Sequence, residues 1–332
     1  MHYRITLPTA AALLRADDAP SAPVVEAAAR YLGAAPGDGP ADVRLAARAG
    51  RPPEPSASDP LCRFEDRWGL WREGPGRFLL GDGDAAVRLD VCAGEGVLTA
   101  TPDALGARPS LSWALLLGGL LFLLRGRGLF SLHAAGLAPP ASGGAARGGG
   151  PAGLLLVAER DAGKSTLAYA LVREGWDYLT DDTVLLRPGP GGVEAFGFRS
   201  YFSLDAEADA LFPGLDRTRR PPLFGEAKRP VDVDALHPGR RVERLAPRLL
   251  VFPEIADVPE SRLVPVARAE ALRQVVGQSA SALAEPDGAP AHLDALARLV
   301  RQTRHVRLLA GRDVLHQPGR VAALLAPLLS PP

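Results

Sequence analysis

Some segments of this chain have the apolar pattern of a strand and others have that of a helix. The clearest change from one pattern to the other lies near the middle of the chain. Residues 154–157 form an unbroken apolar run, which predicts a buried strand. Beyond a polar loop, Leu167, Ala168 and Leu171 recur at the spacing of one helix face. The pattern predicts a strand, a loop and an amphipathic helix in succession.

The next stretch predicts a series of short strands. Gly175 is placed to end the helix in a left-handed cap. Residues 176–180 predict one strand and residues 183–186 the next. The Pro- and Gly-rich stretch 188–192 predicts a turn into a further strand over 193–196.

The same two periods predict the elements of the remaining chain and an α/β fold class. Strands are expected over 1–7, 77–80, 86–91, 96–100, 132–137 and 305–309, and helices over 113–124, 267–282, 291–304 and 319–329. The chain of 332 residues is 47% hydrophobic, enough for two domains. We expect a β-rich α+β domain over 1–125 and a catalytic domain over 126–332. The role of the first domain is open, and substrate binding is one alternative.

The composition of the chain limits the classes of binding partner and the cellular compartment that we expect. A formal net charge of zero disfavours a nucleic-acid or membrane-surface partner, since those need an excess of clustered basic groups. Residues 113–124 are apolar but shorter than the roughly 20 residues of a membrane span, so a buried helix is expected. No signal peptide is expected at the start. Cys62 and Cys92 are too few for a disulfide framework and fit a reduced, cytoplasmic protein.

The loop between the central strand and helix has the composition of a phosphate-binding loop. It consists of Ala158, Glu159, Arg160, Asp161, Ala162, Gly163, Lys164, Ser165 and Thr166. A helix N-terminus offers unpaired backbone N–H groups and a partial positive charge to nucleotide phosphates. Lys164 would reach the β- and γ-phosphates, and Ser165 would offer its hydroxyl to Mg²⁺. The usual pattern opens with glycine, and this loop has Ala158 there, which removes some backbone freedom.

Two adjacent carboxylates, Asp181 and Asp182, directly follow the short strand expected over 176–180. Such a pair is costly to hold together unless a cation or a shared proton relieves it. Alone, the pair would be interpreted as a solvated turn. Shortly after a phosphate-binding loop, it predicts metal binding or catalysis.

These pieces, in this order, resemble the kinase domain of HPr kinase/phosphorylase and its relatives, which are similar in fold to phosphoenolpyruvate carboxykinases. A strand carrying His133 precedes the loop that ends in residues 163–166, and the Asp pair follows. The resemblance implies that Asp181 and Asp182 divide between a general base and a metal-side carboxylate, without saying which is which. It implies an auxiliary role for His133, beside the alternative of a structural strand histidine.

Other segments bear on the substrate. Lys228 and Arg229 are candidates for phosphate contacts, beside the alternative of a solvated basic loop. Residues 138–150 form a low-complexity insert. Residues 196–202 stand where that family has its segment for recognising HPr, and their sequence does not match that segment. In this respect the chain resembles kinases of peptide natural-product clusters, such as lasso peptide clusters, which phosphorylate a serine on a small peptide.

Two functions follow as hypotheses. The first is an ATP- and Mg²⁺-dependent kinase that phosphorylates a hydroxyl, with a serine of a protein or peptide as the expected acceptor. The second is a nucleotide-binding regulatory or scaffold module without phosphate transfer, which Ala158 favours and the Asp pair disfavours. The sequence does not decide which molecule accepts the phosphate, whether the reverse phosphorolysis occurs, or whether the chain forms a homo-oligomer. His237, His292, His305 and His316 are too scattered in sequence to predict a metal site.

Overall fold

The computed structural model divides the chain into two compact units. It describes residues 1–7, 9–64, 68–140, 150–159, 162–199, 201–215, 228–279 and 285–329. Residues 1–130 and 285–292 form the first unit, and the other described residues form the second. The domain boundary expected at residue 125 is close to this division, but the expectation gave 285–292 to the second domain.

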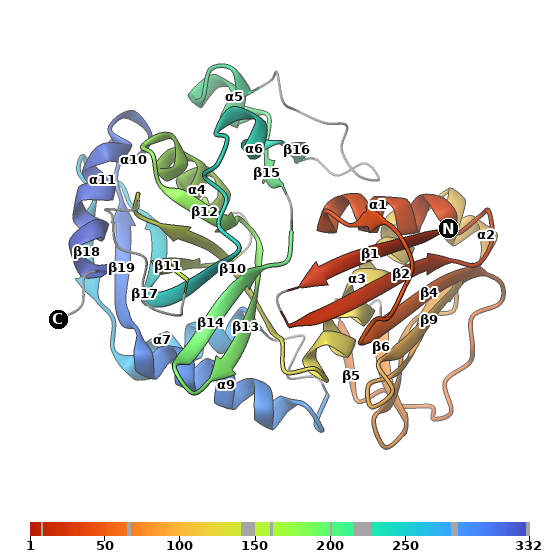
Figure 1. Ribbon diagram of the computed structural model, residues 1–332. Helices are drawn as coiled ribbons and strands as arrows, with labels where there is room; N and C mark the ends of the chain where they lie inside the picture. The colour runs from red at the N-terminus through yellow and green to blue at the C-terminus, as the bar shows by residue number, and fades with distance from the viewer. Residues whose placement is uncertain are drawn as a thin grey trace. The chain divides into compact units, whose positions relative to one another are not determined.

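The first unit is built on a nine-stranded sheet (Figure 1). Its strands follow the spatial order β3-β1-β2-β4-β9-β8-β7-β6-β5. Their bounds are β1 His2–Leu7, β2 Ala10–Ala16, β3 Ala35–Pro36, β4 Val43–Ala49, β5 Cys62–Phe64, β6 Trp68–Gly74, β7 Arg77–Gly81, β8 Ala85–Asp90 and β9 Glu95–Ala100. β4 pairs in parallel with β2 and β9, and the other neighbours are antiparallel.

Three helices belong to the first unit: α1 Ala22–Leu32, α2 Pro102–Gly106 and α3 Pro109–Arg125. α3 packs on β8, β9 and β4, and Leu115, Leu116 and Leu123 are fully buried there. Because Pro109 favours a first helical turn, α3 begins earlier than the helix expected over 113–124. Within the described ranges, no helix combines the length and the apolar character that crossing a bilayer requires.

The second unit contains a mixed sheet whose strand path runs β11-β10-β13-β14-β17-β19-β18, with β12 paired to β10. β11 also pairs in parallel with β17, which closes part of this path on itself. The bounds are β10 Phe130–Ala138, β11 Ala152–Val157, β12 Asp177–Thr180, β13 Thr183–Gly189, β14 Gly192–Gly197, β17 Arg244–Ile255, β18 Arg262–Pro265 and β19 Arg304–Ala310. A separate ladder joins β15 Phe202–Leu204 to β16 Arg229–Val231.

Helix α4, Lys164–Arg173, contributes to the main core of the second unit. Its Leu171 is buried with Leu154 and Leu156 of β11. Tyr169 and Phe212 meet edge to face, with ring centroids 4.9 Å apart. The other helices are α5 Glu207–Leu211, α6 Val233–Leu236, α7 Arg268–Gly277, α9 Ala289–Gln302, α10 Asp313–His316, α11 Pro318–Leu325 and the 3₁₀ turn Ala326–Leu329. This core fixes the helix that follows the expected phosphate-binding loop.

Most elements expected from the sequence are present, with different ends. The turn expected over 188–192 is tighter, because β13 continues to Gly189 and β14 starts at Gly192, whose φ is +115°. The helix expected over 267–282 ends at Gly277. α1 was not expected, although Val24, Val25, Ala28 and Leu32 form an apolar face that is buried.

Candidate active site

The loop expected to bind phosphates leaves β11 at Val157 and enters α4 at Lys164. Gly163, the residue before the helix, has a φ of +79°, a conformation that a side chain strains. A Cβ built on Gly163 would meet nothing within 4 Å. The backbone conformation, and not lack of space, therefore calls for glycine at this position.

Lys164 folds back on the loop. Its Nζ donates hydrogen bonds to the carbonyl oxygens of Ala158, at 2.8 Å, and Glu159, at 2.9 Å. The residue is 5% exposed, so its ammonium is held close to the loop backbone. Ser165 and Thr166 are half-buried in the first turn of α4, where helix geometry leaves backbone N–H groups without intrahelical partners. Arg160 and Asp161, two expected loop residues, lie outside the described residues.

The strand register brings the loop and the Asp pair to the same edge of the sheet. β10 lies between β11 and β12, pairing Ala134 with Val157 on one side. On the other side, the Ala134 N–H donates to the Asp182 carbonyl at 2.8 Å. His133 is the neighbour of Ala134, so it lies at the level where β11 ends and where Asp182 follows β12.

His133 contacts Asp182 directly. Its Nδ1 lies 3.3 Å from Oδ1 of Asp182, and the Thr183 hydroxyl donates to Oδ2 at 2.9 Å. The His133 and Asp182 side chains are 32% and 26% exposed. The pair is therefore held in place by the fold and remains accessible to a small substrate group.

The charge state of Asp182 follows from its surroundings. Burial raises the pKa of this carboxyl, but the positive charge of Arg199 and the hydrogen bond with His133 lower the pKa by more. The net pKa lies well below the ordinary value, so Asp182 is ionised at neutral pH. An ionised carboxylate only accepts hydrogen bonds, so the His133 contact requires a proton on Nδ1.

Asp181 has a different environment from its neighbour. Its side chain is 0% exposed and forms a buried ion pair with Arg199, whose Nε donates to Oδ1 at 3.1 Å and whose Nη2 donates to the same oxygen. The backbone N–H of Ser203 donates to Oδ2 at 3.0 Å. Both oxygens of Asp181 are therefore engaged within the protein.

Arg199 lies between the two carboxylates. Besides its contacts with Asp181, its Nη1 is 3.9 Å from Oδ2 of Asp182. The cation expected to relieve the adjacent carboxylates is thus supplied, at least in part, by the chain itself. The sequence analysis did not single out Arg199, Ser203 or Thr183; the one available signal was a lone cation within the apolar stretch 196–202.

Of the two candidates for phosphate contacts, Arg229 begins β16 and Lys228 directly precedes it. The β15–β16 ladder pairs Arg229 with Leu204 and Pro230 with Ser203. Since Ser203 holds Asp181, the ladder connects this basic pair to the Asp181 environment. Lys228 is half-buried and Arg229 is exposed.

The residues present fit a nucleotide with its Mg²⁺ in the type of groups they offer. The loop supplies an ammonium and helix N–H groups for phosphates, and Ser165 with Asp182 supplies a hydroxyl and an ionised carboxylate for a metal. Within the described residues, no three His, Cys, Asp or Glu side chains cluster as a metal site. Mg²⁺ is commonly bound by one or two carboxylates together with substrate phosphates.

Comparisons with known proteins do not assign the chain to a family. Neither a family model nor a curated protein matches the chain. Among solved structures, it is similar to the HPr(Ser) kinase/phosphatase from Coxiella burnetii at 14% sequence identity and a TM-score of 0.31. The match covers 59% of this chain and 93% of that one. A likeness of this size does not establish a shared fold, so the function has to be argued from the residues themselves.

Proposed function

We propose that the chain is an ATP- and Mg²⁺-dependent kinase that transfers the γ-phosphate to a hydroxyl, with a serine of a protein or peptide as the acceptor. One observation carries the proposal: the loop that holds Lys164 starts at the sheet edge where His133 meets Asp182. A phosphate-binding loop thus adjoins a group able to accept a proton, which are the two parts that phosphoryl transfer requires.

The loop binds and orients the phosphates in this proposal. Lys164 exchanges its bonds to the Ala158 and Glu159 carbonyls for phosphate oxygens, and the first N–H groups of α4 donate to the same chain of phosphates. Ser165 and Asp182 would hold the metal. Mg²⁺, when bound, offsets negative charge on the phosphates.

His133 is the proposed proton acceptor. With Nδ1 donating to Asp182, the lone pair resides on Nε2, which can take the proton of the acceptor hydroxyl. Asp182 stays ionised and stabilises the imidazolium that forms. This assignment exchanges the roles that the resemblance implies for the carboxylate and the histidine. Asp181 acts through Arg199 as a positioning residue, since its oxygens are engaged by the protein.

The alternative is a nucleotide-binding regulatory or scaffold module without transfer. Two observations favour it: Ala158 stands where the usual loop has glycine, and Asp181 is occupied by Arg199. Against it, the accessible His133–Asp182 pair has no evident use in a module that only binds nucleotide.

Transfer of labelled γ-phosphate from Mg²⁺-ATP to proteins and peptides of a host lysate tests the proposal. We expect a labelled species with the wild-type chain and its loss with Lys164→Ala. ATP binding without any Lys164-dependent label would favour the regulatory module. Labelling that survives Lys164→Ala at the wild-type rate would exclude the phosphate-binding loop as the site of transfer.

A further inference from the structure

One face of the nine-stranded sheet in the first unit carries a group of arginines. Along β4, Val43, Leu45 and Ala47 are buried, whereas Arg44 and Arg48 are exposed. Since side chains alternate between the two faces of a strand, the buried set faces α3 and the arginines face away from it. The register places Arg48 beside Thr99 of β9.

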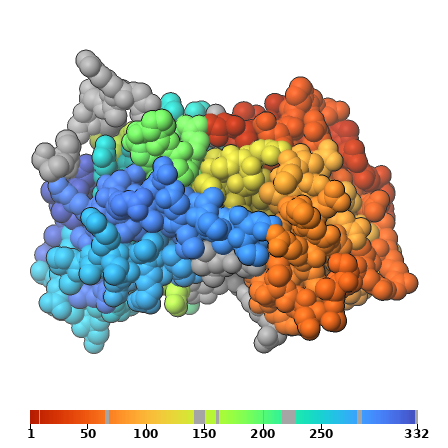
Figure 2. Space-filling model, turned by 90° about the horizontal axis from the view of Figure 1, so that it is seen from below, coloured from red at the N-terminus to blue at the C-terminus, as the bar shows by residue number. Residues whose placement is uncertain are grey.

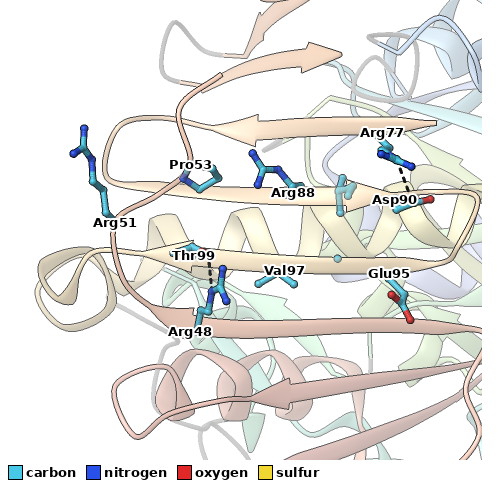
Figure 3. A pocket seen from close by; sticks show the side chains of 11 residues that line it. Arg48, Arg51, Pro53, Arg77, Arg88, Asp90, Glu95, Val97 and Thr99 are labelled. Atoms are coloured by element: carbon cyan, nitrogen blue, oxygen red, sulfur yellow. Dashed lines mark hydrogen bonds and ion pairs between the residues drawn. The ribbon is translucent and has the colours of Figure 1, made fainter. Parts of the chain in front are cut away.

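This face holds a depression of about 420 Å³ (Figure 3). Its lining includes four arginines, Arg48, Arg51, Arg77 and Arg88. Figure 3 shows the arginine side chains coming from neighbouring strands and from the segment after β4, with a helix behind the sheet. In the space-filling view, part of residues 50–100, drawn in orange, forms an uncovered surface (Figure 2).

The arginines differ in their partners. Arg88 forms two hydrogen bonds with Glu73, at 2.6 and 2.9 Å, and Arg77 lies 3.4 Å from Asp90. Arg51 pairs with Glu54. Arg48 donates through Nε to the Thr99 hydroxyl at 3.2 Å, and among the described residues no carboxylate lies within ion-pair distance of it.

The character of the lining indicates the class of ligand. The strands of this face are interior strands of the sheet, so their backbone groups are used in the ladders and only side chains can bind. Guanidinium groups bind carboxylates well, and Pro53 and Val97 add apolar surface beside them. The volume exceeds that of a single small anion and suits several residues of a peptide.

We propose that this face, the depression lined by Arg48, Arg51 and Arg88, binds an acidic segment of a partner polypeptide. A carboxylate of that segment pairs with Arg48, which makes no ion pair within the described residues, and its apolar side chains lie on Val97 and Pro53. The proposal concerns the first unit and does not depend on phosphate transfer in the second.

Two features favour a polypeptide over nucleic acid or an anionic membrane. The lining has no aromatic side chain on which bases could stack. The chain as a whole has a formal net charge of zero, without the basic excess that phosphate backbones attract.

Fluorescence anisotropy with the full-length chain tests the proposal. The probe is a fluorescein-labelled dodecapeptide, (Glu-Ala-Glu-Ser)₃, and its counterpart has Lys in place of Glu. We expect the Glu peptide to bind and the Lys peptide not to bind. Binding should weaken with added salt, since exposed charges are screened. Arg48→Ala should weaken it about fivefold and Arg48→Glu about tenfold or more.

Arg108→Ala is the matched control, because Arg108 is an exposed arginine of the first unit outside the depression. It should leave peptide affinity unchanged, and so should Lys164→Ala, whatever the outcome for phosphate transfer. Thermal unfolding of each variant shows whether it is folded. No binding of the Glu peptide, or equal affinity in wild type and folded Arg48→Glu, would overturn the proposal. So would Arg48-dependent binding of a labelled single-stranded DNA or of phosphatidylserine vesicles that exceeds binding of the peptide.

Discussion

Nδ1 of His133 lies 3.3 Å from Oδ1 of Asp182, although His133 is on β10 and Asp182, far from it in the sequence, is in the turn after β12. The contact depends on β10, which pairs with both β11 and β12 and so brings His133 to the end of each. An ionised carboxylate next to an imidazole fixes the ring tautomer and leaves Nε2 as a proton acceptor. The proposed role of His133 as proton acceptor rests on this geometry.

His133→Gln should lower kcat by about 10²–10⁴-fold, the range for removal of a general base, and leave ATP affinity unchanged. Glutamine keeps a polar group of similar size but cannot take a proton. Steady-state kinetics and equilibrium ATP binding measure the two effects separately. His316→Gln, at an exposed position of α10, is the control. A wild-type kcat in His133→Gln would show that the imidazole is not the proton acceptor.

The Asp181–Arg199 ion pair should matter for stability. Asp181→Ala should lower the free energy of unfolding by about 3–5 kcal/mol, because it leaves the buried Arg199 charge without its main partner. Urea denaturation measures this change. The double variant Asp181→Ala, Arg199→Met should lose less than the sum of the single variants. An unchanged urea midpoint in Asp181→Ala would contradict the buried ion pair.

Acid should reduce the contribution of Asp182 to stability. Because its pKa is lower in the folded chain than in the unfolded one, the contribution is full above the unfolded pKa, about 3.9, and is lost as pH falls toward the folded pKa. The difference in unfolding free energy between wild type and Asp182→Asn should therefore shrink below about pH 4. Denaturation of the metal-free chain from pH 2 to 7 measures it, with the exposed Asp294→Asn as control. A difference that stays constant with pH would refute the lowered pKa.

Gly163 and Gly106 offer a matched comparison. Neither has an atom within 4 Å of a built Cβ, but only Gly163 has a positive φ. Gly163→Ala should cost about 1–2 kcal/mol of stability through backbone strain. Gly106→Ala, within α2, should not destabilise, since alanine favours helix more than glycine does. Equal thermal stability of the two variants would rule out strain at the entry to α4.

Arg125 and Glu285 form a second buried ion pair, with side chains 5% and 3% exposed. Glu285 also accepts hydrogen bonds from the N–H groups of Asp287 and Gly288. Glu285→Ala should cost about 3–5 kcal/mol and speed amide hydrogen exchange across 285–292. Asp287→Ala, which removes an exposed pair with Arg72, should cost less than about 1 kcal/mol. Unchanged exchange in Glu285→Ala would show that this pair does not hold the segment.

The sequence by itself determined the local elements around the site. The apolar run of β11, the helical spacing of α4 and the Gly-Lys-Ser-Thr end of the loop are patterns of neighbours along the chain. Backbone periodicity depends mainly on such neighbours, so the strand, loop and helix could be predicted, as could the strand that precedes Asp181 and Asp182.

Only the tertiary structure decided how the two adjacent carboxylates differ. Asp181 is enclosed by Arg199 and Ser203, whereas Asp182 meets His133 and stays partly exposed. His133 comes from β10, Ser203 from β15 and Arg199 from the segment between β14 and β15, and the packing of these distant segments decides which oxygen each one reaches. The assignment of residues 285–292 to the first unit has the same origin in long-range contacts. Side-chain environments depend on which distant segments pack together, and periodicity along one segment does not contain that information.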